Sequence, residues 1–379
     1  MRAIWVCILL ITFAKVEGSV FPIYDDGPRI LAFADMEYGR LQLKVKSGTF
    51  TLTAYTPDSV FTMTYEEDDV HPLYTFRGDL RLNRAGCDSI VFTTKDTIEI
   101  RVLQGKNWTP IRPYLGKVTL RPNLIYLETI VQVPVEHYIA GVVEAEGGLC
   151  EEIEYHKAQA VLARTWLISN ARKHVDEGYH IKDDQSSQAF KGIPHGKNAR
   201  IISQAVEQTK GLIATFEGTP IVGFYHSNSG GYTVQPEHVW SKKVGYCRTV
   251  YDPFSKNQSK YTWEKDLALE AWHSYFFPDE RDFNWSTFFA ALPAERVSYY
   301  TINGKEFKLE SVRREFGLRS SYFKPTLIGG KVHLEGKGFG HGVGMSQQGA
   351  MRMAQGGFEW KEILDFYFQH LAFESVNKF

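Results

Sequence analysis

The chain has 379 residues, with 43 Lys and Arg against 44 Asp and Glu, so its formal net charge is −1 at pH 7. This balance argues against nucleic acid as a partner, because nucleic-acid-binding surfaces are strongly basic. A hydrophobic content of 43% with 23% charged residues excludes an intrinsically disordered chain, and the length allows two or three domains.

Residues 1–18 have the pattern of a signal peptide. Met1 and Arg2 supply positive charge, and residues 3–14 form an apolar run too short to span a bilayer comfortably. Gly18 and Ser19 offer a cleavage point, whereas Lys15 and Glu17 are unusual before one, so an uncleaved membrane anchor is the alternative. We therefore expect an exported protein.

Residues 29–121 contain short stretches in which apolar and polar residues alternate, separated by Gly, Asp and Pro. A period of two is typical of strands with one buried face. The clearest of these stretches are residues 41–46, 49–54, 90–93 and 98–102. This part of the chain is predicted to be a β-rich N-terminal region.

From residue 124 onward the pattern becomes mixed. A strand over residues 124–133 precedes Pro134, where a helix is predicted to open and to run through Glu146. Gly147 and Gly148 are predicted to end this helix by adopting a left-handed conformation. Further helices are predicted over residues 152–173 and 201–209, followed by a hairpin over residues 211–225 with its turn at 217–220. The predicted fold class is therefore α+β.

Glu146 is the sharpest catalytic candidate in the sequence. It shares a helix face with Ile139, Val142 and Val143, so its carboxylate would leave the apolar side at the negative end of the helix dipole. Both effects raise a carboxyl pKa and favour a general acid. The alternative is a solvated glutamate at a helix end. Arg164 and Lys157 have a similar alternative as salt-bridge partners of Glu154 and its neighbours.

Other chemistry is weakly indicated. The sequence has no GxxxxGK[ST], HExxH, GxSxG or paired CxxC motif. A glycine-rich loop over residues 336–344 contains His341, and it is either a structural turn or a loop that lets a polyhydroxylated ligand approach closely.

The cysteines are predicted to be inert. Cys150 and His156 could form a thiol nucleophile with its base, but Glu151 and Glu152 disfavour a thiolate at Cys150. Cys150, His226, His238 and Cys247 match no zinc spacing, so neither a metal nor another cofactor is predicted. Loss of Cys7 with the signal would leave three cysteines, enough for one disulfide.

Six ordered blocks resemble the SpoIID/LytB family of proteins that act on peptidoglycan. They span residues 133–350 and read VPVEHYIAGVVEAE (133–146), KAQAVLART (157–165), QAFKG (188–192), AVEQTKG (205–211), YHSNSGGYT (225–233) and GFGHGVGMSQQGA (338–350). The N-terminal β region is only loosely similar. The residue patterns and the resemblance together predict three segments, namely a signal peptide (1–18), a β-rich region (19–122) and, from the resemblance, a SpoIID-like catalytic core (123–379).

The enzymes of this family are lytic transglycosylases that cleave peptidoglycan glycan strands, often strands already stripped of stem peptides. Their essential acid is the Glu of an E-M-P block, which is Glu146 in this chain, although Gly147 and Gly148 replace Met-Pro. Such an enzyme needs only one carboxylate, because the 6-hydroxyl of the substrate attacks the anomeric carbon. The resemblance further implies that Arg164 and His341 orient the sugar or its lactyl group. Five other residues are expected to supply hydrogen bonds, namely Tyr225, Ser227, Ser229, Ser346 and Gln347.

The sequence therefore predicts an exported lytic transglycosylase of the periplasm or cell envelope, whose partners are glycan strands and an N-acetylmuramoyl-L-alanine amidase. Other family members are amidase enhancers without a demonstrated cleavage activity, so a non-catalytic glycan-binding enhancer is the second interpretation. A metal- or thiol-dependent envelope peptidase is the third.

Overall fold

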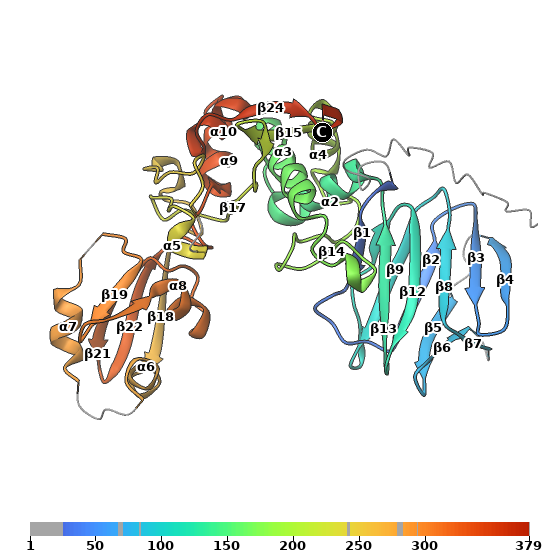
Figure 1. Ribbon diagram of the computed structural model, residues 1–379, viewed down its shortest axis with the longest axis horizontal. Coiled ribbons are helices and arrows are strands. Elements are labelled where there is room, and N and C mark those ends of the chain that lie inside the picture. The colour runs from blue at the N-terminus through green and yellow to red at the C-terminus, as the bar shows by residue number, and fades with distance from the viewer. Residues whose placement is uncertain are drawn as a thin grey trace, which may run out of the picture.

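The computed structural model describes residues 26–66, 71–82, 85–240, 243–278, 283–293 and 295–378. The described chain forms a β-sandwich, a helical part and a small α/β unit, with the helical part between the other two (Figure 1). Helices and strands are both abundant, so the predicted α+β class is confirmed. The predicted signal segment lies outside the described residues.

The N-terminal strands form two sheets, and all their pairings are antiparallel except the pairing of β1 with β14. The first sheet has the order β14 (Ile181–Lys182), β1 (Arg29–Ala32), β13 (Tyr126–Gln132), β12 (Lys117–Asn123), β8 (Ser89–Thr93), β3 (Thr49–Tyr55) and β4 (Val60–Glu66). The second has the order β10 (Asn107–Trp108), β9 (Ile98–Gln104), β2 (Arg40–Val45), β5 (His71–Phe76), β6 (Asp79–Leu82) and β7 (Ala85–Cys87), with β11 (Arg112–Tyr114) paired to β9.

The predicted alternation is confirmed in these sheets. In β3 the buried residues are Phe50, Leu52 and Ala54, and the residues between them are half-buried. Burial of alternate residues on strands such as β2, β3, β8 and β9 builds the core between the two sheets.

The helical part contains α2 (Val135–Gly147), α3 (Ile153–Asn170), α4 (Ala199–Gln208), α5 (Glu237–Trp240), α9 (Gln347–Gln355) and α10 (Trp360–Tyr367). Two small sheets accompany them. One has the order β16 (Thr219–Pro220), β15 (Leu212–Phe216) and β24 (Ala372–Ser375), and the other pairs β17 (Tyr225–His226) with β23 (Met345–Ser346). Short 3-10 turns lie at Val175–Glu177, Pro253–Ser255 and Val376–Lys378.

The end of α2 differs from the predicted left-handed cap. Gly148 has φ −65°, an ordinary right-handed value, and its carbonyl accepts a hydrogen bond from the Asn198 side chain at 2.8 Å. Glycine is needed at these positions for space instead. A Cβ atom on Gly147 would lie 1.9 Å from the Tyr155 hydroxyl, and one on Gly148 would lie 2.6 Å from the Glu144 carbonyl oxygen.

The sandwich and the first helices share one hydrophobic core. Buried residues of β1, β13, α2 and α3 belong to the same cluster. Asp183, just after β14, accepts hydrogen bonds from the backbone N–H groups of Phe33 (2.6 Å) and Ala34 (2.9 Å) and pairs with Arg112 (2.6 Å). The boundary predicted between residues 122 and 123 falls inside the β12–β13 pairing, so no break in packing lies there.

Residues 262–337 form a separate unit that the sequence analysis placed within the catalytic core. Its elements are β18 (Thr262–Ala268), α6 (Leu269–Phe276), α7 (Trp285–Ala291), β19 (Tyr299–Ile302), β20 (Lys305–Lys308), α8 (Leu309–Glu315), β21 (Phe323–Ile328) and β22 (Lys331–Lys337). This inserted unit has its own aromatic core around Trp272. The Gly338 N–H donates to the Tyr261 carbonyl at 2.7 Å, so the segment leaves and rejoins the helical part at one point.

Candidate active site

Glu146 lies in the last turn of α2 with a partly buried side chain. One of its carboxylate oxygens, Oε1, accepts a hydrogen bond from the Ala189 backbone N–H at 3.1 Å. The side chains of Tyr225 and Gln347 also hydrogen bond to the carboxylate. Three segments that are distant in the sequence therefore surround the Glu146 carboxylate at the end of α2.

A chain of neutral polar groups surrounds this carboxylate. The Tyr138 hydroxyl donates to Gln188 Oε1 at 3.1 Å, and Gln188 Nε2 donates to the Tyr225 hydroxyl at 3.2 Å. On the other side Gln347 Nε2 lies 3.4 Å from both the Glu146 carbonyl oxygen and Gln159 Oε1. These contacts fix the orientation of the groups that face Glu146.

The position of Tyr225 and Gln347 follows from one short pairing. β17 and β23 run parallel, with Tyr225 opposite Met345 and His226 opposite Ser346. Ser346 is the N-cap of α9, and its hydroxyl accepts the Gly349 N–H at 3.3 Å. The pairing therefore places the first residue of α9, Gln347, beside the strand that carries Tyr225.

Burial raises the pKa of Glu146 above its ordinary value. The hydrogen bonds from Ala189, Tyr225 and Gln347 and the positive charge of Lys260 act in the opposite direction but do not cancel the effect of burial. Burial also raises the pKa values of Tyr138 and Tyr225 well above the ordinary tyrosine value. The tyrosines thus remain neutral hydrogen-bond donors, while Glu146 holds its proton to higher pH than an exposed glutamate.

Lys260 belongs to this site and was not predicted. Its ammonium donates to the Ser227 hydroxyl at 2.9 Å and lies 5.2 Å from the centre of the Phe339 ring. It stands in a stretch without a recognisable motif, so the sequence carried no signal for it. Gln188 was also missed as a site residue, although its QAFKG block was one of the six that carried the resemblance.

The three serines that were predicted to bind the glycan differ in solvent exposure. Ser227 is half-buried at Lys260, whereas Ser229 and Ser346 are almost completely inaccessible, at 1% and 0% exposure. The Ser229 hydroxyl contacts Asp252 Oδ2 and the Ser255 hydroxyl, both at 2.8 Å. This buried network argues against a direct contact of Ser229 or Ser346 with a glycan, because its atoms already bond one another.

His341 lies on another side of Tyr225. Its ring centre is 4.9 Å from that of Trp240 and 5.5 Å from that of His226, and its Nδ1 accepts the Val343 N–H at 3.0 Å. Burial, reinforced by the charge of Arg313, lowers the pKa of His341 to about 3. The imidazole is therefore neutral at physiological pH and offers no positive charge to a substrate.

Arg164 does not face the site. Its side chain is 0% exposed, and its guanidinium donates to Glu136 (3.1 and 2.5 Å) and to the Leu212 carbonyl oxygen (2.9 Å). The predicted role in orienting the sugar requires an accessible guanidinium, and in this structure the guanidinium is buried. Arg164 instead ties α3 to α2 and β15.

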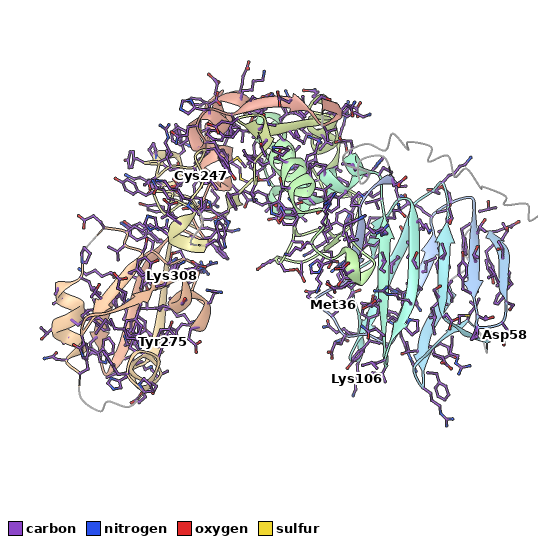
Figure 2. All side chains as sticks on the ribbon, in the orientation of Figure 1. Met36, Asp58, Lys106, Cys247, Tyr275 and Lys308 are labelled. Carbon is purple, nitrogen blue, oxygen red and sulfur yellow. The ribbon has the colours of Figure 1, made fainter. Side chains whose placement is uncertain are left out.

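The two cysteines considered as reactive groups, Cys150 and Cys247, have no feature that activates a thiol. Cys150 and Cys247 are free and buried, and burial raises the pKa of Cys150 and raises that of Cys247 to about 12. Figure 2 labels Cys247 in the helical part. His156 Nε2 contacts the Cys150 carbonyl oxygen at 2.8 Å rather than its sulfur. Within the described ranges, His, Cys, Asp and Glu side chains form no group of three or more that could hold a metal.

Comparisons with known proteins match the region that carries Glu146. A family model described as stage II sporulation protein (SpoIID) matches residues 126–216. Stage II sporulation protein D of Bacillus amyloliquefaciens is 31% identical over 267 residues, which cover 66% of this chain and 77% of that protein. An amidase enhancer of Bacillus subtilis is 28% identical over 286 residues, covering 61% of this chain and 39% of that protein.

A further relative extends the similarity to nearly the whole chain. An uncharacterised protein of Brachyspira hyodysenteriae is 26% identical over 370 residues, covering 92% of this chain and 96% of that protein. The N-terminal β-sandwich is therefore part of the region shared with this relative.

Proposed function

Because the chain belongs to the SpoIID family, we propose that it acts on peptidoglycan as a lytic transglycosylase with Glu146 as its acid and base. The observation that carries this proposal is the partly buried Glu146 carboxylate, whose pKa is raised by burial and which is held by three hydrogen bonds. A carboxyl group with a raised pKa keeps its proton to higher pH than an exposed glutamate and can protonate a leaving oxygen.

In the proposed reaction Glu146 gives its proton to the glycosidic oxygen as the bond from this oxygen to the anomeric carbon breaks. The 6-hydroxyl of the same sugar then attacks the anomeric carbon, and its proton passes to the Glu146 carboxylate. The new bond closes an anhydro ring, no water is consumed, and Glu146 ends in its starting state. One carboxyl group suffices, in contrast to the pair that hydrolysing glycosidases use.

The neighbouring residues support this cycle. Hydrogen bonds from Ala189, Tyr225 and Gln347 stabilise the carboxylate after it has given up its proton. Lys260 adds positive charge next to the same group. Burial favours the protonated acid that begins the cycle, and these donors favour the carboxylate that accepts the proton in the second step.

The proposed substrate is glycan strands whose stem peptides have been removed, and the proposed place of action is the periplasm or cell envelope. The family name connects the chain with sporulation-like remodelling of the wall, and cell division is another process that needs it. Within the described residues no helix is both long and apolar enough to cross a membrane.

A second candidate function is a non-catalytic module that stimulates an amidase. Two observations favour it, namely the similarity to an amidase enhancer and the replacement of Met-Pro by Gly147 and Gly148 next to the acid. The close approach of the Tyr155 hydroxyl to Gly147 gives this replacement a structural reason, since any larger residue at 147 would collide with Tyr155.

Mass spectrometry of peptide-free glycan incubated with the purified chain tests the first function against the second. We expect anhydro-sugar ends from the wild type and none from Glu146→Gln, which keeps hydrogen bonding but carries no transferable proton. Glu144→Gln is the matched control, because Glu144 lies two residues earlier on α2 and accepts the backbone N–H groups of His195 and Gly196. Glycan binding without any anhydro product from the wild type would favour the enhancer.

A further inference from the structure

We propose that a pocket between the inserted unit and the helical part binds a carboxylate-bearing sugar ring of a glycan strand. This inference rests on the proposed function, because it assigns a second binding site to the same substrate. The tyrosine–lysine pocket, as we name it, is lined by six side chains, namely Tyr232, Tyr251, Lys256, Tyr261, Tyr322 and Lys337.

The size and shape of the tyrosine–lysine pocket suit one sugar ring. Its volume is about 320 Å³, at the lower end of the ~300–1,000 Å³ of small-molecule sites. Tyr232 and Tyr251 are 43% and 49% exposed, with ring centres 5.2 Å apart. Exposed tyrosines present flat apolar faces together with hydroxyl groups, and a pyranose ring offers the complementary surface of C–H faces and hydroxyls.

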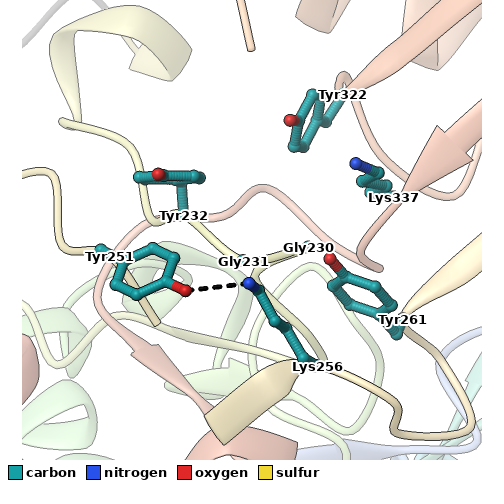
Figure 3. A pocket seen from close by; sticks show the side chains of 8 residues that line it. All are labelled: Gly230, Gly231, Tyr232, Tyr251, Lys256, Tyr261, Tyr322 and Lys337. Atoms are coloured by element: carbon teal, nitrogen blue, oxygen red, sulfur yellow. Dashed lines mark hydrogen bonds between the residues drawn. The ribbon is translucent and has the colours of Figure 1, made fainter. Parts of the chain in front are cut away.

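The charge of the pocket suits an anion. Its lining includes Lys256 and Lys337 and no acidic residue. The Lys256 ammonium donates to the Tyr251 hydroxyl at 2.8 Å, and the Lys337 ammonium lies 5.6 Å from the centre of the Tyr322 ring. Figure 3 shows both ammonium groups turned toward the space between the tyrosines. The positive charges of both lysines would attract a carboxylate placed there, and each ammonium could donate a charge-assisted hydrogen bond to an anion.

A third cation lies behind the tyrosines. The Arg296 guanidinium donates to the backbone carbonyl oxygens of Tyr232 at 2.9 Å and Ser229 at 3.2 Å, and it lies 5.6 Å from the centre of the Tyr322 ring. It fixes the loop that carries Tyr232 while adding positive charge beneath the pocket. This arrangement strengthens the preference for an anion over a neutral sugar.

Two chain segments connect the tyrosine–lysine pocket with the candidate active site. Tyr232 lies in the segment that follows Tyr225 of β17, and Lys260, whose charge acts on Glu146, directly precedes Tyr261. Because Lys260 and Tyr261 are adjacent in the chain, the proposal places one glycan strand along both Lys260 and the pocket. The carboxylate that such a strand carries after its stem peptide is removed is the lactyl group of muramic acid.

The test measures glycan affinity by calorimetry in a Glu146→Gln background, which prevents cleavage during the measurement. Two peptide-free glycans of equal length are compared, one with free lactyl carboxylates and one with the same carboxylates converted to methylamides. The pocket variant combines Lys256→Met with Lys337→Met. Lys331→Met is the matched control, because Lys331 is exposed at the opposite end of β22 from Lys337.

We expect the double variant to weaken binding of the carboxylate glycan ~10-fold, since two charge-assisted contacts are lost, and to change binding of the methylamide glycan less than ~2-fold. Tyr322→Ala should weaken binding of both glycans, because its ring contacts do not depend on charge. Lys331→Met should bind both as the parent does. Unchanged thermal unfolding of each variant confirms that the fold is intact.

Equal affinity of the double variant and the parent for the carboxylate glycan would overturn the pocket assignment. Binding of polyglutamate to the double variant and to the parent is measured as well. A loss of polyglutamate affinity equal to the loss for the carboxylate glycan would also overturn the assignment, because it would indicate a non-specific basic surface. Failure of the proposed function would give a different result. The chain with Glu146 intact would then release no anhydro ends, although it would still discriminate between the two glycans.

Discussion

Replacement of Arg164 by methionine should lower the free energy of unfolding by about 3–5 kcal/mol, the range for breaking a buried ion pair from one side. Three hydrogen bonds disappear, two to Glu136 and one to the Leu212 carbonyl oxygen. Methionine fills the apolar part of the space, but the Glu136 carboxylate, whose side chain is 17% exposed, loses its guanidinium partner. The Gly211 N–H at 3.2 Å remains as one donor to it.

Urea unfolding followed by circular dichroism measures this loss. Lys210→Met is the control, because the Lys210–Glu207 pair is 3.5 Å long with side chains 59% and 70% exposed, and such pairs contribute less than ~1 kcal/mol. Combining Arg164→Met with Glu136→Leu should restore part of the stability, since no buried charge then remains.

Kinetics distinguish this structural role from the sugar-orienting role that the family resemblance implies. Below the unfolding transition, Arg164→Met should bind glycan with nearly wild-type affinity, because the guanidinium is inaccessible. Stability within ~1 kcal/mol of the wild type together with clearly weaker glycan binding would refute the structural interpretation.

Three further predictions concern the site. As a general acid Glu146 must be protonated, so kcat/KM should fall as pH rises through its raised pKa. Lys260→Met should move this fall to higher pH, because it removes a charge that lowers the pKa of Glu146. An unshifted pH profile would show that Lys260 does not act on the acid. Since the pKa of Glu146 is raised in the folded state, its favourable contribution to stability is present at low pH and lost as pH rises through that pKa. Glu146→Gln should therefore raise the unfolding temperature at pH 7 but not at pH 4. Equal shifts of the unfolding temperature at both pH values would contradict the desolvation argument. Iodoacetamide and EDTA should leave cleavage unchanged, because Cys150 and Cys247 are buried thiols with raised pKa values; loss of cleavage with either reagent would reveal thiol or metal chemistry.

Local patterns in the sequence determined much of this protein. The alternation over residues 49–54 predicted β3, and the placement of Pro134 and Gly147 predicted the limits of α2. The position of Glu146 on the apolar side of α2 predicted its desolvation, which the raised pKa reflects. These features depend on periods of two and 3.6 residues, which act between near neighbours and are therefore visible in the sequence.

Tertiary structure decided which groups surround Glu146 and which only resembled ligands. The Ala189 N–H and the Gln347 side chain reach Glu146 across 43 and 201 residues of sequence, and Lys260 arrives there without a motif. Arg164 stands in the block KAQAVLART, which resembles the family, yet packing turns it to Glu136. No local periodicity specifies such long-range contacts, because they depend on how separate helices and strands pack and on which polar groups that packing leaves accessible.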